Sequence, residues 1–155
     1  MLYLGVDLGG TNIKAALVDE NGEILQETGT PTNLPRSAEA VCDDIAVLCN
    51  QLTAGRDVAG IGVGCPGTVD GGTVLYSNNL DWHNFEMCSY LKAKTNLPVV
   101  VGNDANVAAL GEALVGCAKG AQSAVVVTLG TGVGGGVVLG GKLLTGYTGA
   151  AAEPG

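Results

Sequence analysis

The chain has 155 residues and a formal net charge of −8 at pH 7, and 26 of its residues are glycine. The acidic balance argues against nucleic acid or an anionic membrane surface as a partner. With 46% hydrophobic residues the chain is not expected to be disordered, and its glycines follow no three-residue period, which excludes collagen. The glycines are therefore expected at tight turns or where the backbone approaches a ligand closely.

The N-terminal segment predicts three short strands. Residues 2–8 and 12–19 are mostly apolar, and glycines separate them. Asn21-Gly22 is a strong hairpin signal before a third strand at 23–29. Turns this short join antiparallel strands, so an antiparallel meander is expected.

Helices and buried strands follow the meander. A helix is predicted between Ser37, a good capping residue, and Gly55. Residues 58–64 and 98–102 are apolar runs typical of buried parallel strands, and 85–95 is a weaker helix candidate. The apolar stripe of the first helix consists of Val41, Ile45, Leu48 and Leu52.

The last part of the chain predicts one more helix and a hairpin. The helix is expected to reach Gly120, and the hairpin strands are 124–129 and 133–139. An earlier hairpin is expected over 68–76, around an Asp-Gly-Gly turn. The apolar face of the helix is expected to consist of Val107, Leu110, Leu114 and Cys117.

The cysteines form no Cys-x-x-Cys pair. An odd, widely spaced set of this kind predicts reduced, buried thiols in a cytosolic protein rather than disulfides. The sequence shows neither a signal peptide nor an apolar run long enough to cross a membrane. The five cysteines are Cys42, Cys49, Cys65, Cys88 and Cys117.

Two glycine-rich turns are candidate phosphate sites. The segment Asp7–Lys14 joins two strands, so its amide groups and the Thr11 hydroxyl could bind a phosphate beside an Asp7-held magnesium ion. It is not a P-loop, because the motif and its helix are missing. The segment 130–136 contains Gly-x-Gly-x-x-Gly, but a strand follows it, which disfavours a dinucleotide fold. A plain β-turn is the alternative for the first segment.

Asn103-Asp104 follows a buried strand and begins a helix. A carboxylate at the carboxyl end of a sheet strand could accept a proton from a substrate hydroxyl during phosphoryl transfer. Asp is also a favoured N-cap residue, so the catalytic and the capping role of Asp104 both stay open on these residues alone.

The segments 65–67 and 77–82 could recognise a sugar through amide side chains and the Trp82 indole. The alternative is a polar loop with one core tryptophan. His83 is the single histidine, so a Ser-His-Asp triad with a second candidate histidine cannot be built. The sequence also has no Cys and His spacing typical of a zinc site.

Together these segments resemble the ROK family of bacterial sugar kinases. The resemblance covers the whole chain in order. The matching segments are DLGGTNIK (7–14), GVGCPGTVD (62–70), NNLDW (78–82), NDANVAALGE (103–112) and TLGTGVGGGVVLGGKLLTG (128–146).

The resemblance implies an α/β chain with the actin-like ATPase, or ribonuclease H-like, fold and a mixed five-stranded sheet. Residues 1–120 would form the N-terminal lobe, and residues 121–155 would form the opening hairpin of a truncated second lobe. The implied activity is transfer of the ATP γ-phosphoryl group to a hexose hydroxyl, with the 6-OH of glucose expected.

The resemblance also implies the role of each site residue. Asp104 would be the general base, and Asp7 would hold Mg²⁺ through water. The expected sugar-binding residues are Asn79, Asn103, Asp104, Glu153 and Gly67. The residues expected around the ATP phosphates are Asp7, Gly9, Gly10, Thr11, Asn12, Lys14, Gly130, Thr131 and Gly132.

Members of the family are longer than this chain, so a fragment or truncated form is expected. A structural Zn²⁺ site is expected only in the missing C-terminal part, with none in this chain. The expected partners are a sugar and ATP, with no nucleic acid and no membrane, in a cytoplasmic homodimer. The open alternatives are a kinase for fructose, N-acetylmannosamine or N-acetylglucosamine, a sugar-responsive regulator, and a non-catalytic half.

Overall fold

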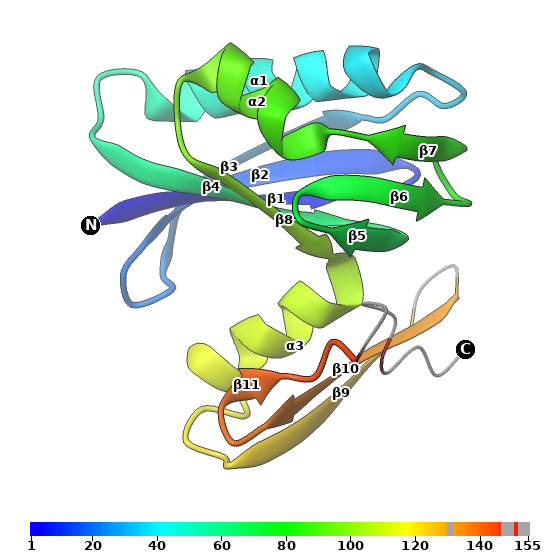
Figure 1. Cartoon of the computed structure of the whole chain (residues 1–155). Helices are drawn as coiled ribbons and strands as arrows, with labels where there is room; N and C mark the ends of the chain where they lie inside the picture. Colours follow the sequence, from blue (N-terminus) through cyan, green and yellow to red (C-terminus); the bar gives the residue numbers. More distant parts are fainter. Residues whose placement is uncertain (130–131, 147–150, 152–155) are drawn as a thin grey trace. The chain divides into compact units, whose positions relative to one another are not determined.

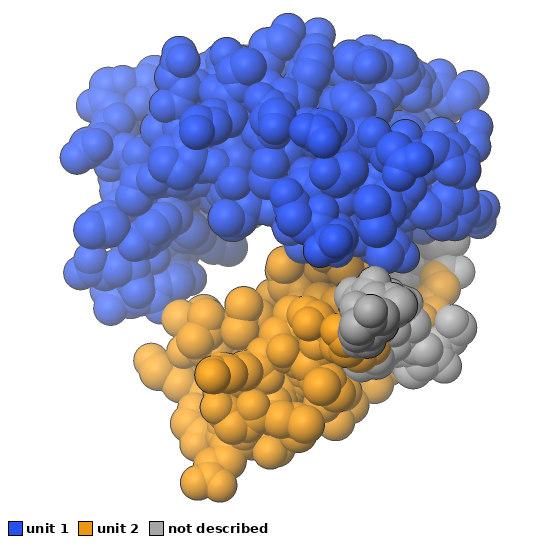
Figure 2. All heavy atoms as spheres, in the orientation of Figure 1, with its two compact units in different colours: residues 1–102 blue, residues 103–155 orange. Residues whose placement is uncertain are grey.

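The structure is a computed structural model that describes residues 1–129, 132–146 and 151 (Figure 1). The chain divides into two compact units, Met1–Gly102 and Asn103–Gly155 (Figure 2). The division falls before the last long helix, whereas the lobe boundary expected from the sequence follows residue 120. That boundary stays a prediction.

A five-stranded mixed sheet organises the first unit. Its order is β3-β2-β1-β4-β8. The meander is antiparallel, as predicted, and β4 runs parallel to β1. The strands are β1 (Leu2–Leu8), β2 (Asn12–Asp19), β3 (Ile24–Pro31), β4 (Val58–Cys65) and β8 (Val99–Asn103). The predicted α/β class and mixed five-stranded sheet are therefore confirmed.

Two helices lie on the same face of this sheet (Figure 1). They are α1 (Ala38–Thr53) and α2 (Met87–Thr95). The side-chain hydroxyl of Ser37 caps α1 by accepting a hydrogen bond from the Ala40 amide at 3.3 Å, as the sequence predicts. Every residue of the predicted stripe on α1 is buried.

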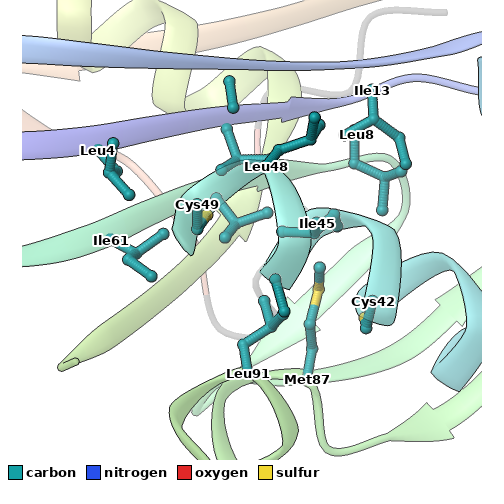
Figure 3. Packing of buried hydrophobic residues seen from close by; sticks show 14 of the residues in the cluster. Leu4, Leu8, Ile13, Cys42, Ile45, Leu48, Cys49, Ile61, Met87 and Leu91 are labelled. Carbon is teal, nitrogen blue, oxygen red and sulfur yellow. The ribbon is translucent and has the colours of Figure 1, made fainter. Parts of the chain in front are cut away.

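Alternation along the strands decides which residues face the helices. In β1, Leu4, Val6 and Leu8 are buried, whereas Asp7 is exposed. Successive side chains of a strand point to opposite faces, so the sheet buries one set and leaves Asp7 on the other face. The core combines these leucines with side chains of α1 and with Met87 and Leu91 of α2 (Figure 3).

A smaller three-stranded sheet lies between α1 and α2 in the sequence. It contains β5 (Thr68–Asp70), β6 (Thr73–Ser77) and β7 (Trp82–Phe85). The hairpin of β5 and β6 was predicted, but β7 was not, because its mixed polar and aromatic residues indicate a loop. The Trp82 side chain is 3% exposed, and its ring packs edge-on against Phe85 at a centroid distance of 5.6 Å. The core alternative for Trp82 is confirmed.

The second unit consists of one helix and a three-stranded antiparallel sheet. The helix is α3 (Asp104–Leu114), and the strands are β9 (Ser123–Leu129), β10 (Val133–Leu139) and β11 (Lys142–Leu143). The predicted helix end at Gly120 is wrong, because α3 stops at Leu114. The Glu112 carboxylate accepts a hydrogen bond from the Cys117 amide at 2.8 Å. This bond holds the loop after α3 against the last turn of the helix.

The predicted apolar face of α3 is also wrong. Val107 and Leu114 are exposed, and the buried residues are Ala105, Asn106 and Ala109. The reason lies in β10: a Cβ at Gly136 would stand 2.5 Å from the Ala109 Cβ. The helix lies so close to this glycine strand that only small side chains fit between them.

All five cysteines are free, as expected. Cys42, Cys49 and Cys65 are buried, and burial raises the pKa of the Cys49 thiol to about 12. Cys117 is exposed, so the expectation of burial is wrong for it. Among the described residues, no helix is both long and apolar enough to cross a membrane.

The packing of α1 yields a stability prediction. Ile45 is fully buried, whereas Val47 on the same helix is 55% exposed. Ile45→Ala should lower the free energy of unfolding by about 2–5 kcal/mol, because it leaves a cavity. Val47→Ala should change it by less than about 0.5 kcal/mol. Urea unfolding of both variants checks this, and equal effects would contradict the position assigned to α1.

Candidate functional site

Three predicted site segments follow neighbouring strands of the large sheet. Asp7 of β1 pairs with Gly64 of β4 in parallel register. The Ile61 amide donates to the Pro98 carbonyl at 2.9 Å, and a Cβ on Gly62 would lie near the Val100 side chain, so β8 runs alongside β4 in the same direction. Strands β1, β4 and β8 therefore end at one edge, where ligands of such sheets bind.

The turn after β1 is tied down by hydrogen bonds at both ends. Within the turn, the Gly9 amide donates to the Asn12 carbonyl at 2.9 Å. From outside, the Thr32 hydroxyl donates to the Gly9 carbonyl at 2.7 Å, and the Thr32 amide donates to the Thr11 carbonyl at 2.8 Å. Gly10 and Thr11 are exposed. The turn is thus fixed from the interior and open to solvent.

Gly10 is one of the described glycines, with Gly5, Gly111 and Gly132, for which neither a positive φ nor a close neighbour requires glycine; of these four, it lies in the turn after β1. A Cβ at Gly9 would lie 3.0 Å from the Asn12 carbonyl oxygen, and one at Gly29 would lie 2.8 Å from the Ile13 carbonyl oxygen. At Gly10 nothing lies within 4 Å, and its φ is not positive. Gly10 therefore suits the close approach of a ligand, which is the alternative use of glycine.

A carboxylate and an ammonium group stand beside this turn. Asp7 and Lys14 are direct cross-strand partners of β1 and β2, and both are exposed. On the other side of Asp7, its partner in β4 is Gly64, which has no side chain. A carboxylate that can hold hydrated Mg²⁺ and an ammonium group that can bind phosphate suit a metal–phosphate ligand.

The segment predicted to meet the sugar is held by a close backbone contact. Gly67 has a φ of 108°, and a Cβ there would lie 2.2 Å from the Tyr76 carbonyl oxygen. Gly67 therefore packs on the end of β6, directly before the exposed Asn78 and Asn79. The structure brings Gly67 and the Asn79 segment together but gives the buried Trp82 indole no exposed stacking face.

Asn103, not Asp104, is the N-cap of α3. The Asn103 side chain accepts a hydrogen bond from the Asn106 amide at 3.0 Å, so the capping role considered for Asp104 is wrong. Asp104 is the first helical residue and is half-buried, and one of its carboxylate oxygens accepts from the Ala105 amide at 2.8 Å. The positive end of the helix dipole stabilises a negative charge at this position.

The second glycine turn is partly described. Leu129 at the end of β9 pairs with Val133 at the start of β10. The expectation that a strand follows the glycines is confirmed. Gly132 is exposed and a Cβ there would meet nothing within 4 Å. Gly130, Thr131 and Glu153 lie outside the described residues.

Two features of the candidate site were not predicted from the sequence. The role of Thr32 in fixing the turn depends on contacts between residues distant in sequence. Asn106 is 4% exposed, and its Oδ1 accepts no hydrogen bond from any residue that the structure describes. Among the described residues, no three His, Cys, Asp or Glu side chains cluster as metal ligands.

The whole chain matches known proteins. A family model described as "ROK family" matches residues 3–155. The chain belongs to the ROK family. It is 43% identical over 154 residues to a glucokinase of Streptomyces coelicolor, covering 98% of this chain and 48% of that protein. It is 37% identical over 163 residues to an N-acetylmannosamine kinase of Escherichia coli, covering 100% and 53%.

A solved structure of a ROK family glucokinase from Streptomyces griseus, in complex with glucose and AMPPNP, superposes with a TM-score of 0.91 at 42% identity. The match covers 99% of this chain and 49% of that one. The fold is therefore the actin-like ATPase fold of the ROK sugar kinases. This chain spans about half the length of the relatives that it matches.

The glycine contacts give a second prediction. Gly29→Ala should lower the free energy of unfolding by about 1–3 kcal/mol, because the added Cβ meets backbone. Gly10→Ala should leave it unchanged or raise it by less than about 1 kcal/mol, because Ala reduces the entropy of the unfolded chain. Chemical denaturation of the two variants measures both values. A loss at Gly10 as large as that at Gly29 would show that the turn needs glycine for folding.

Proposed function

We propose that this chain is the N-terminal part of an ATP-dependent hexose kinase that transfers the γ-phosphoryl group to the 6-OH of glucose. The observation that carries the proposal is the fixed turn at the carboxyl end of β1, where the exposed Gly10 leaves open space beside the paired Asp7 and Lys14. The likeness to glucokinases supports the choice of sugar.

Asp104 is the proposed general base. Its carboxylate accepts the proton of the sugar hydroxyl while the oxygen of that hydroxyl forms a bond to the γ-phosphorus. The bond between the γ-phosphorus and the β–γ bridging oxygen breaks, and its electron pair leaves with ADP. Asn103 caps the helix and so fixes the start of α3, where Asp104 lies. Asn79, Asn103, Gly67 and Glu153 are the proposed sugar-binding residues.

The ATP phosphates are proposed to lie against the two glycine turns. Backbone amides of Gly9, Gly10, Thr11 and Asn12 would face one part of the triphosphate, and those of Gly130, Thr131 and Gly132 another. Lys14 would add a positive charge. Asp7 would hold Mg²⁺ through water, and the bound ion would neutralise charge on the phosphates.

A second candidate is a kinase for N-acetylmannosamine, supported by the relative of that name at 37% identity. Both candidates share the base and the phosphate turns, so they differ only in the sugar. A homodimer, a cytoplasmic location and a zinc site beyond this segment stay predictions.

Activity is best measured in an extended protein in which residues 1–155 are followed by the remaining part of the Streptomyces coelicolor glucokinase. This protein should phosphorylate glucose, and Asp104→Ala should lower its kcat by at least about 100-fold, because the base is lost. Asp57→Asn, at an exposed carboxylate in the loop before β4, is the matched control and should keep kcat. A coupled ADP-release assay measures both, and a normal kcat for Asp104→Ala would rule it out as the base.

A panel of glucose, fructose, N-acetylmannosamine and N-acetylglucosamine separates the candidates. Highest kcat/KM for glucose supports the proposal, whereas highest kcat/KM for N-acetylmannosamine supports the second candidate. If the extended protein melts cooperatively and phosphorylates none of the four sugars, the kinase proposal is wrong.

Gly10→Ala tests the phosphate turn in the same protein. The methyl group should raise KM for ATP about tenfold, equivalent to about 1.4 kcal/mol, because it occupies the space proposed for a phosphate. Gly111→Ala on α3, where nothing lies within 4 Å of the added Cβ, is the control and should leave KM unchanged. An unchanged KM for ATP in Gly10→Ala would remove the ligand explanation of this glycine.

A further inference from the structure

Thr32 is a fully buried polar residue in the loop that follows β3. It is 23 residues from Gly9 in the sequence, yet its hydroxyl donates to the Gly9 carbonyl at 2.7 Å. Its backbone amide donates to the Thr11 carbonyl at 2.8 Å. One buried residue therefore binds two carbonyl groups of the same turn.

These bonds determine the direction of an amide group. The Gly9 carbonyl and the Gly10 N–H belong to one peptide plane, and in a trans peptide they point in opposite directions. Because the carbonyl is held toward the buried Thr32, the Gly10 N–H is directed away from the interior. It is thus aimed at the exposed side of the turn, where Gly10 leaves the space open.

Thr32 is itself held in place from α1. The Arg36 guanidinium donates to the Thr32 carbonyl at 3.3 Å and to the Ala40 carbonyl at 3.0 Å. It also forms an ion pair with Asp44 of α1. The hydrogen bond to Asp44 raises the pKa of Arg36 above its usual range. The turn is therefore connected through Thr32 and Arg36 to a packed helix.

We propose that Thr32 is a positioning residue for nucleotide binding, which orients the Gly10 amide to donate a hydrogen bond to a phosphate oxygen of ATP. This inference rests on the proposed function for its ligand. An oriented amide at a preformed site costs no reorganisation when the anion binds. Loss of the Thr32 hydroxyl would leave the Gly9 carbonyl without its buried donor and free the peptide plane to rotate.

The test compares two substitutions in the extended protein. Thr32→Val keeps the shape and removes the hydroxyl, whereas Thr32→Ser keeps the hydroxyl. Thr32→Val should weaken binding of Mg·AMPPNP about tenfold in calorimetry and raise KM for ATP in parallel, with KM for glucose unchanged. Thr32→Ser should restore affinity to within about threefold of the unmutated protein. Thr53→Val, which removes a hydroxyl bonded to the Asn50 carbonyl at 3.2 Å in α1, is the matched control and should leave nucleotide affinity unchanged.

A second measurement follows the unmutated protein and needs a variant only to assign one resonance. The unmutated extended protein is labelled with ¹⁵N-glycine, and the amide resonance of Gly10 is assigned by its absence in Gly10→Ala. This resonance should shift when Mg·AMPPNP is added. An unshifted Gly10 resonance on saturation with Mg·AMPPNP overturns the inference. So does a Thr32→Val protein that binds Mg·AMPPNP normally, or one in which KM for ATP and KM for glucose rise together.

Failure of the proposed function has a different signature. The unmutated extended protein would then bind Mg·AMPPNP and show the Gly10 shift without phosphorylating any sugar. Absence of nucleotide binding in the unmutated protein would overturn both statements.

Discussion

The parallel pairing of β1 with β4 is the constraint on which the rest of the candidate site depends. It aligns Asp7 with Gly64 and makes the two strands end at the same edge, so that the Gly9–Asn12 turn and the Pro66–Gly67 segment begin there. The antiparallel pairing of β1 with β2 then sets Lys14 opposite Asp7. A one-residue change of register would move these charges to the buried face, and the leucines packed under α1 prevent such a change.

The glycines of this chain are required for different physical reasons. Gly29 and Gly136 are required because neighbouring atoms leave no room for a Cβ, and Gly67 is required in addition by its φ of 108°. Gly10 meets none of these conditions. Gly5, Gly111 and Gly132 meet none of them either, but Gly10 lies in a turn that the buried Thr32 holds by two hydrogen bonds. A fixed turn with open space beside its amide groups suits an anion.

Much of the fold could be predicted, because its signals are local. Helical periodicity predicted α1, apolar runs separated by short turns predicted the meander, and Asn21-Gly22 predicted its second hairpin. The buried face of α3 could not be predicted from the pattern of the helix. It depends on β10, where Gly136 has no side chain and Ala109 packs against it. The N-cap of α3 could not be predicted either, because Asn and Asp are equally good capping residues and the structure uses Asn103. The role of Thr32 has no local signal, because its two bonds join segments distant in sequence.

The central claim is that the Gly9–Asn12 turn binds the phosphates of ATP. A crystal structure of the extended protein with Mg·AMPPNP and glucose tests it most directly. We expect a phosphate oxygen within about 3.2 Å of the Gly10 amide nitrogen, with the Thr32 hydroxyl still bonded to the Gly9 carbonyl. A bound nucleotide whose phosphates contact neither Gly10 nor Thr11 would contradict the claim.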